Sequence, residues 1–350
     1  MHPSPTSSSD VAGHPGRPPA WGDLTVEAMA APSPHNTQPW VLEVIDERTA
    51  WLGYDPARLL PDTDSTGRFQ TIALGVFAEA LDVAAGRAGH RVVVVGSPGR
   101  LDMTPGPPRR AVELRLEPAP HGERIPTGDL EARCTNRRPY NGLPVSADAA
   151  VFLAEVGRGG GHEVVITSQP ALVDWAVDLN TETLFYDLSG LKERGELGRW
   201  IRASSRHEAT SRDGLSARCL GFPGALVGLF FRYHRLAETP GVKQMLRVYY
   251  RRSQRGTASV GWIRGPQRGP DDWFRAGRML LRLWLAIGQE GLVIHPYGSV
   301  ITNPTSHRRL AEKIKVTEDP DDELWLLFRI GAPTRAARQS YRLDATEVLR

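Results

Sequence analysis

Apolar residues recur every three or four positions over residues 66–86, the spacing of a helix with one buried face. The apolar positions are Phe69, Ile72, Val76, Phe77, Ala80 and Val83. Ser65 or Thr66 is the expected N-cap, because a hydroxyl there can accept a hydrogen bond from a free backbone N–H of the first turn. The pattern therefore predicts a long helix over this stretch.

A second long helix is predicted over residues 271–290. Its apolar side chains cover most of the helix circumference, which is typical of a central helix buried on several sides. Asp271 and Asp272 suit the positive N-terminal end of such a helix, and a glycine at position 291 ends it. Its three arginines, Arg275, Arg278 and Arg282, share one stripe, which is either an exposed edge or an edge that faces anions.

Shorter apolar or alternating segments predict strands over residues 40–45, 51–54, 91–96, 111–117, 163–167, 259–263 and 323–330. Further helices are expected over residues 24–30, 129–134, 147–156 and 171–185. The mixed order of elements predicts an α+β protein with two comparable halves. We place their boundaries at residues 21–120 and 121–350, although no close sequence repeat relates the two.

Two regions lack a clear period. Residues 1–20 are rich in Pro, Ser, Gly and His, so we expect a disordered leader with no apolar core of a signal peptide. Residues 186–258 contain apolar patches separated by Gly221, Pro223 and Gly224, so we expect an irregular region.

The composition excludes several classes of protein. Over 350 residues, 43 basic side chains balance 40 acidic ones, too evenly to indicate nucleic-acid binding. Cys134 and Cys219 have no metal-ligand spacing, so neither a metal site nor a disulfide framework is expected. No run reaches 18 apolar residues, so we expect no membrane partner and a cytoplasmic protein.

The most informative segment is Ala31-Pro-Ser-Pro-His-Asn-Thr-Gln-Pro-Trp40, which lies between a helix and a strand. Its carboxamides offer both hydrogen-bond donors and acceptors, as does the edge of a flavin pyrimidine ring. Its prolines reduce the entropy that is lost when the loop is held ready for a ligand. From these residues alone, a turn that only ends a helix and opens a strand is equally compatible with the segment.

A second segment, Arg133-Cys-Thr-Asn-Arg-Arg-Pro-Tyr140, contains the pattern R-x-[S/T]-x-R. Two guanidinium groups on either side of a hydroxyl can bind a phosphate through charge-assisted hydrogen bonds. The spacing alone is common, and a solvated basic turn is then the simpler interpretation.

Together these segments resemble the FMN-dependent nitroreductases, which carry a PSxxNxQPW loop against the flavin ring and an R-x-S-x-R phosphate motif. The form with His before Asn is similar to the branch that contains the mycobacterial Acg proteins. The resemblance implies an FMN cofactor bound by nine residues of this chain. Its predicted contacts are Pro32, Ser33, His35, Asn36 and Gln38 at the ring, Arg133, Thr135 and Arg137 at the phosphate, and Arg342 in the tail.

In ordinary nitroreductases the phosphate motif precedes the ring-binding loop, whereas here it follows about a hundred residues later. The resemblance therefore implies a nitroreductase-like fold in which the two halves of one chain mimic the nitroreductase dimer and form one composite site. Residues 276–293 resemble the core helix of the family and its exit, and residues 324–331 resemble its final strand. By analogy, residues 186–258 form a lid. The chain is then a monomer with an internal pseudo-dimer, or a homodimer.

The implied function is that of an FMN-dependent oxidoreductase, with hydride transfer through flavin N5 between NAD(P)H or an organic substrate and an acceptor. No side chain is expected to act as a catalytic acid or base. The alternatives are a protein that stores or sequesters FMN, and a biosynthetic flavin dehydrogenase. Nucleic-acid binding through the arginines of residues 249–268 is a third class, which salt-dependent retention on DNA would support.

Overall fold

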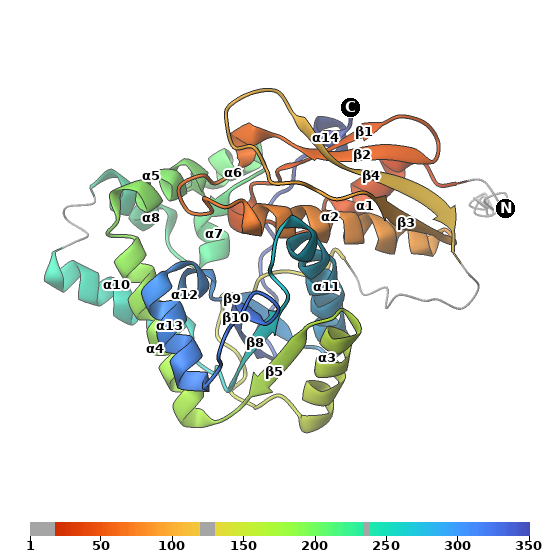
Figure 1. The fold of residues 1–350 in the computed structure, drawn as a ribbon. Helices are drawn as coiled ribbons and strands as arrows, with labels where there is room; N and C mark the ends of the chain where they lie inside the picture. Colours follow the sequence, from red (N-terminus) through yellow and green to blue (C-terminus); the bar gives the residue numbers. More distant parts are fainter. Residues whose placement is uncertain (1–17, 120–129, 234–238) are drawn as a thin grey trace, which may run out of the picture.

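The computed structural model describes residues 18–119, 130–233 and 239–350. Most of the predicted leader, the boundary between the predicted halves and the first residue of the predicted 129–134 helix lie outside these ranges. Within them, two long helices cross between two four-stranded antiparallel sheets, and α4 (Pro170–Asp187), α12 (Gly298–Thr302) and α13 (Pro304–Ile314) cover the far side of the second sheet (Figure 1). The prediction of an α+β protein is confirmed.

The first sheet has the spatial order β1 (Trp40–Val44), β2 (Thr49–Tyr54), β4 (Arg109–Pro118) and β3 (His90–Val95). The second sheet has the order β5 (Glu163–Thr167), β8 (Ser259–Gly265), β10 (Glu323–Gly331) and β9 (Val293–Pro296). Seven of these strands match predicted segments within a few residues. The eighth, β9, was missed because four residues are too few for a visible alternation.

The two parts of the chain have the same succession of core elements. In the first part, α1 (Trp21–Ala28) precedes two strands, and α2 (Arg68–Arg87) separates them from the next two. In the second part, α3 (Ala147–Gly159) and α11 (Pro270–Gln289) occupy the same places in the order. Both sheets thus connect their strands in the spatial order first, second, fourth, third.

Helices α2 and α11, each of 20 residues, meet backbone to backbone at two glycines. A Cβ atom at Gly75 would lie 2.0 Å from the carbonyl oxygen of Phe274, and one at Gly277 would lie 2.0 Å from that of Ile72. Each glycine is the eighth residue of its helix, and each lies against the backbone carbonyl of the fifth residue of the other helix. The contact is therefore reciprocal. The small residues allow the helices to approach far more closely than larger side chains would.

Ion pairs join the same helices beside the crossing. Arg278 donates to Glu79 (2.7 Å) and to Asp82 (2.8 Å), and Arg282 also bonds Glu79. Glu79 is fully buried, and burial followed by the nearby Glu79 charge raises the pKa of Asp82. Two arginines of the predicted stripe, Arg278 and Arg282, therefore face the carboxylates of α2, whereas Arg275 is exposed and bonds Asp272 of its own helix at 2.6 Å.

Helix α2 has the length and composition of a membrane span, but most of its residues are buried by the rest of the protein, as expected for a core helix. Its predicted N-cap was wrong: Gly67 occupies that position with φ of 74°, and the buried Asp64 carboxylate accepts the Gln70 N–H of the first turn at 2.8 Å. The left-handed backbone at position 67 favours glycine, because a residue with a Cβ atom would be strained there.

The region predicted to be irregular is mostly helical, so that prediction was wrong. After α4 (Pro170–Asp187) come α5 (Leu191–Trp200), β6 (Ile201–Arg202), α6 (Ser205–Ser211), β7 (Leu215–Ser216), α7 (Ala217–Leu220), α8 (Gly224–Arg232) and α10 (Pro240–Ser253). These helices are short and start at local caps such as Ser204 and Ser216. Their period is too brief to be seen in the sequence, and their apolar faces are completed only by packing against one another and against α4.

The tail connects the two parts of the molecule. After α12 (Gly298–Thr302), α13 (Pro304–Ile314) and β10, residues 332–350 return to the first sheet through α14 (Ala345–Val348) (Figure 1). The Val44 N–H donates to the Arg350 carbonyl at 3.0 Å, and Leu349 forms a parallel bridge with Leu42. Residues 130–134 contain a turn and no helix, unlike the predicted helix there.

We expect Gly277→Ala to lower the free energy of unfolding by about 3 kcal/mol, the upper end of the usual cost of overpacking. The added methyl group would overlap the Ile72 carbonyl, which belongs to a rigid helix backbone. Gly288→Ala is the matched control, since it lies in the same helix with no atom near its Cβ position and should stabilise slightly. Urea unfolding measures both, and equal effects would contradict the role of the crossing.

Candidate functional site: a basic pocket beside the residue 31–39 loop

A pocket of about 420 Å³ lies where four segments of the chain meet. They are the loop before β1, residues 131–137, the tail around residues 338–345 and the segment from Arg212 to Cys219. Eight of the nine predicted site residues line it: Pro32, Ser33, His35, Asn36, Arg133, Thr135, Arg137 and Arg342. The fold thus places the two sequence motifs on one cavity.

The loop before β1 has an unusual backbone. His35, Asn36 and Gln38 have φ values of 51°, 54° and 51°, in the left-handed region that non-glycine residues rarely adopt. The single 3-10 turn Pro34–Asn36 lies within it. The Ser33 hydroxyl oxygen accepts a 2.9 Å hydrogen bond from the Gln38 N–H, which closes the loop on itself. Such strain persists only where the surroundings hold the chain, and it is common at binding sites.

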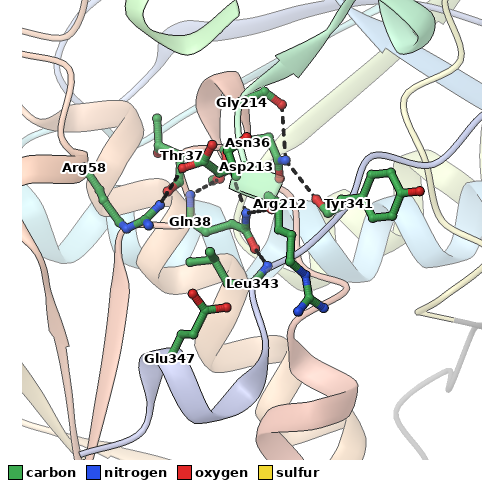
Figure 2. A network of polar contacts seen from close by, with 12 residues as sticks. Asn36, Thr37, Gln38, Arg58, Arg212, Asp213, Gly214, Tyr341, Leu343 and Glu347 are labelled. Carbon is green, nitrogen blue, oxygen red and sulfur yellow. Dashed lines mark hydrogen bonds and ion pairs between the residues drawn. The ribbon is translucent and has the colours of Figure 1, made fainter. Parts of the chain in front are cut away.

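Gln38 is the predicted site residue that does not line the pocket. Its carboxamide is fully buried and bonded to protein (Figure 2). It donates to the Arg212 carbonyl at 3.0 Å and accepts from the Leu343 N–H at 2.9 Å. The side chain therefore ties the loop to the tail and to the segment around Arg212. Its predicted contact with a flavin stays untested.

Asn36 has one carboxamide atom bonded to protein and one without a partner. Its Nδ2 donates to the carbonyl oxygens of Gly214 (3.2 Å) and Tyr341 (3.1 Å), as Figure 2 shows. Its Oδ1 is buried and has no hydrogen-bond partner within the described residues. A buried acceptor without a partner costs free energy, so it marks a place where a ligand N–H or a water fits.

Three arginines bring positive charge to the pocket without a carboxylate partner in the described part of the chain. Arg133 is 8% exposed; its Nη2 donates to the Ala30 carbonyl at 3.0 Å, while Nε and Nη1 have no partner. Its guanidinium lies 4.6 Å from the ring centre of Trp284. Burial, and then the charge of Arg342, lower the pKa of Arg133 to about 9.

The other two arginines are half-buried. Burial lowers the pKa of Arg342 to about 10, and its Nη1 reaches only backbone carbonyls of its own tail, at 3.3 Å. Burial also lowers the pKa of Arg137, for which the described residues provide neither a hydrogen bond nor an ion pair. Desolvated cations without counter-charges form a strong site for an anion.

His35 lies beside these cations and stays neutral. Burial, followed by the Arg137 charge, lowers its pKa to about 4, and its Nδ1 is buried without a partner. At neutral pH its ring can therefore exchange hydrogen bonds with a ligand without adding charge.

Arg329 supports the site without lining the pocket, and no sequence motif indicated this role. It lies in β10, the strand predicted to resemble the final strand of the nitroreductases. It is fully buried in β10, and its Nη2 donates to the carbonyls of Asn136 (3.2 Å) and Arg138 (2.9 Å). Its guanidinium also stacks on Tyr140, 4.1 Å from the ring centre. Arg329 thus holds the residue 133–140 segment, which β9 holds from another direction through Ile294 and Thr135.

The segment around Asp213 is attached to the loop by charge as well as by hydrogen bonds. Arg58 donates to the Thr37 carbonyl (2.9 Å) and to Asp213 (3.1 Å), and Arg202 binds the other oxygen of Asp213 at 2.6 Å (Figure 2 shows Arg58 and Asp213). Asp213 is 8% exposed. Nothing in the sequence indicated these contacts, because their partners are separated by up to about 150 residues and show no motif.

Comparisons with known proteins give neighbours in structure only. No protein-family model matches this sequence, and neither does any curated protein sequence. Structural neighbours are FMN-dependent nitroreductases. One is the FMN- and NADPH-dependent nitroreductase NfnB from sphigopyxis sp. strain HMH, at 12% identity and a TM-score of 0.39 over 63% of this chain and 96% of that chain.

Two further neighbours are of the same kind. NfnB from Mycobacterium smegmatis, solved with NADPH, has 14% identity and a TM-score of 0.37 over 62% of this chain and 93% of that chain. A nitroreductase from Desulfitobacterium hafniense DCB-2, solved with FMN, has 10% identity and a TM-score of 0.36 over 61% and 90%. With TM-scores below 0.5, these likenesses establish no family for the chain.

A buried histidine beside the residue 133–137 segment is expected to make stability depend on pH. His295 in β9 is buried, and burial, followed by the charges of Arg137 and Arg329, holds its pKa well below its usual value. The unfolded chain takes up a proton near pH 6.5, whereas the folded protein does not, so stability is retained above that pH and falls below it.

We therefore expect His295→Gln to flatten the pH dependence of the free energy of unfolding. Between pH 6.5 and 5 the wild-type slope should exceed that of the variant by up to about 1.4 kcal/mol per pH unit. Urea unfolding at four pH values measures both slopes, so a difference in absolute stability does not affect the comparison. Identical slopes would show that folded His295 takes up its proton as readily as an exposed histidine.

Proposed function

We propose that this chain binds one FMN in the basic pocket. The observation that supports this most directly is the convergence of Arg133, Arg137 and Arg342 on a cavity that also contains the unpartnered Asn36 Oδ1. A phosphate group would supply the negative charge that these guanidinium groups lack within the described residues. Its oxygens would accept charge-assisted hydrogen bonds, which are among the strongest in proteins.

The rest of the pocket fits the other end of such a ligand. Asn36 Oδ1 is an acceptor suited to a ring N–H, and neutral His35 can accept or donate. Pro32 and Ser33 line the same wall, and the strained loop is already held in place before a ligand enters. A prepared loop loses little entropy on binding, which favours affinity.

We further propose that the protein is an FMN-dependent oxidoreductase of the nitroreductase superfamily. When bound, FMN supplies hydride transfer at its N5 atom, and the protein holds and orients the ring. No residue needs to act as a catalytic acid or base: His35 stays neutral, and the arginines stay charged at neutral pH. NAD(P)H or an organic substrate is the proposed hydride donor.

In this proposal the two parts of the chain take the roles of two subunits of a nitroreductase. The loop before β1 belongs to the first part and the residue 133–137 segment to the second, so the site requires both. The repeated order of helices and strands in the two sheets supports this, as does the reciprocal contact of Gly75 and Gly277. The sequence form PSPHNTQPW supports a place in the Acg-like branch.

Flavin storage is the second candidate, and one observation favours it. The segment from Arg212 to Gly214 is bonded to the ring-binding loop through Asn36, Gln38 and Arg58. Arg212 lines the pocket, so a segment bonded to the loop in this way would slow the exchange of a bound flavin. Slow exchange suits sequestration more than rapid turnover.

Arg137→Ala should weaken FMN binding by tenfold or more, because a charged hydrogen bond to phosphate contributes about 1.5–3 kcal/mol. Riboflavin lacks the phosphate, so its affinity should change by less than about twofold. Quenching of flavin fluorescence measures both ligands. Arg137 is the better choice than Arg133, whose contacts with Trp284 and Ala30 also support the fold.

Arg100→Ala is the matched control, since Arg100 is exposed on the loop between β3 and β4 and does not line the pocket. It should leave both affinities unchanged. Equal losses of FMN and riboflavin in Arg137→Ala would assign Arg137 a structural role, and unchanged FMN affinity would refute the phosphate assignment.

A further inference from the structure

Helix α10 has two apolar faces, of which one is covered and one is not. Its inner face packs against Phe185 and the apolar side of α8 through Val242, Leu246 and Tyr250. Its outer face exposes Met245 (57%) and Val248 (41%), with Tyr249 (40%) at its edge, where the ring packs on Phe222 and the hydroxyl donates to the Gly221 carbonyl at 3.0 Å. These residues are spaced three and four apart, so they form one stripe along the helix.

Exposed apolar residues are concentrated in this part of the molecule. Of the twelve large hydrophobic side chains exposed within the described residues, five lie between positions 229 and 249. Besides the α10 stripe, they include Leu229 (45%) and Tyr233 (51%) at the end of α8. Soluble monomers rarely gather such side chains without a binding partner. Helices α8 and α10 lie at the periphery of the molecule, away from the first sheet (Figure 1).

The same helix is strongly basic. Residues 239–255 contain Lys243, Arg247, Arg251, Arg252 and Arg255 and no acidic residue. Arg251 is bound to Asp178 of α4 (2.9 Å), whereas Arg252 and Arg255 are exposed and have no ion pair within the described residues. The outer stripe is thus accompanied by cations that are open to solvent.

We propose that α10 docks this protein onto the surface of a membrane that contains anionic phospholipids. Apolar side chains enter the boundary between headgroups and acyl chains, and basic residues on the same helix attract the lipid charge. Tyr233, 51% exposed, suits this boundary, where one end of the ring is apolar and the other wet. Such docking is peripheral and requires no membrane-spanning segment.

Charge selects this partner over a second copy of the chain. A symmetric contact through the stripe would bring the basic residues of this helix close to those of the same helix in the other copy, with no acidic residue on either helix. The repulsion of these like charges opposes self-association, while an anionic lipid surface complements every one of them.

The C-terminal end of the docking helix adjoins the residue 133–140 segment, part of which lines the basic pocket. The carbonyl of Ser253, its last residue, accepts a hydrogen bond from Arg329 (3.3 Å), and the carbonyl of Arg255 accepts one from the Tyr140 N–H (3.0 Å). Membrane docking would therefore place the 133–140 segment close to the lipid surface. The proposal does not depend on which ligand occupies the pocket.

The test is sedimentation of the full chain with sucrose-loaded vesicles of phosphatidylcholine alone or with one quarter phosphatidylglycerol. We expect binding to the anionic vesicles to be at least tenfold tighter, and to fall severalfold between 0.1 and 0.5 M NaCl because salt screens the attraction. Val248→Asp places a carboxylate on the exposed stripe and should reduce this binding at least tenfold.

Val151→Asp is the matched control: Val151 is also an exposed valine on a helix, α3, and is 60% exposed. It should bind vesicles as the wild type does. Circular dichroism and thermal unfolding verify that both variants fold.

Four outcomes would overturn the proposal. The first is equal binding to neutral and anionic vesicles, and the second is an equal loss in Val151→Asp. The third is a concentration-dependent dimer, seen by sedimentation velocity without lipid, that Val248→Asp abolishes, since the stripe would then bind a second copy. Salt-dependent DNA retention that Arg252→Glu abolishes, with no vesicle binding, would likewise assign the basic helix to nucleic acid.

Discussion

The close crossing of α2 and α11 sets the geometry of the whole molecule. Gly75 and Gly277 allow two buried helices to touch through their backbones, and Glu79 and Asp82 accept the arginines of α11 beside the contact. Helix α2 connects strands of the first sheet and α11 connects strands of the second. Their contact therefore fixes one part of the chain relative to the other. The basic pocket is assembled from both parts, so the position of its walls depends on a crossing that contributes no residue to it.

Several features of the pocket lower the stability of the protein when no ligand is bound. It holds three arginines without carboxylates in the described chain, an unpartnered amide oxygen and a loop with three strained non-glycine residues. Each feature costs free energy, and the proposed anion with a polar ring would offset the cost of the unpaired charges and of the unpartnered oxygen. The fixed positions come from outside the pocket: Arg329 holds the 133–140 segment, and Gln38 ties the loop to the tail.

The sequence predicted the long elements well because their periods extend over many residues. It placed α2, α11 and seven of the eight core strands, and it missed β9 and the short helices of residues 191–253, whose faces are defined only by packing. The two motifs were visible, but only a resemblance brought them together, since no local signal reports that Asn36 and Arg137 share a cavity. The link from Arg58 through Asp213 to Arg202 joins distant residues of common types, which leave no trace in one sequence.

The proposed function requires that this pocket hold a working flavin. The decisive measurement is anaerobic titration of the FMN-reconstituted protein with NADPH or NADH, followed through the visible absorption band of the bound flavin. We expect one FMN for each chain and loss of the band on addition of the reduced nucleotide. A band that persists with both nucleotides would rule out the NAD(P)H-driven reductase and favour storage or a substrate-driven dehydrogenase, and failure to bind FMN at all would refute the proposed flavin site.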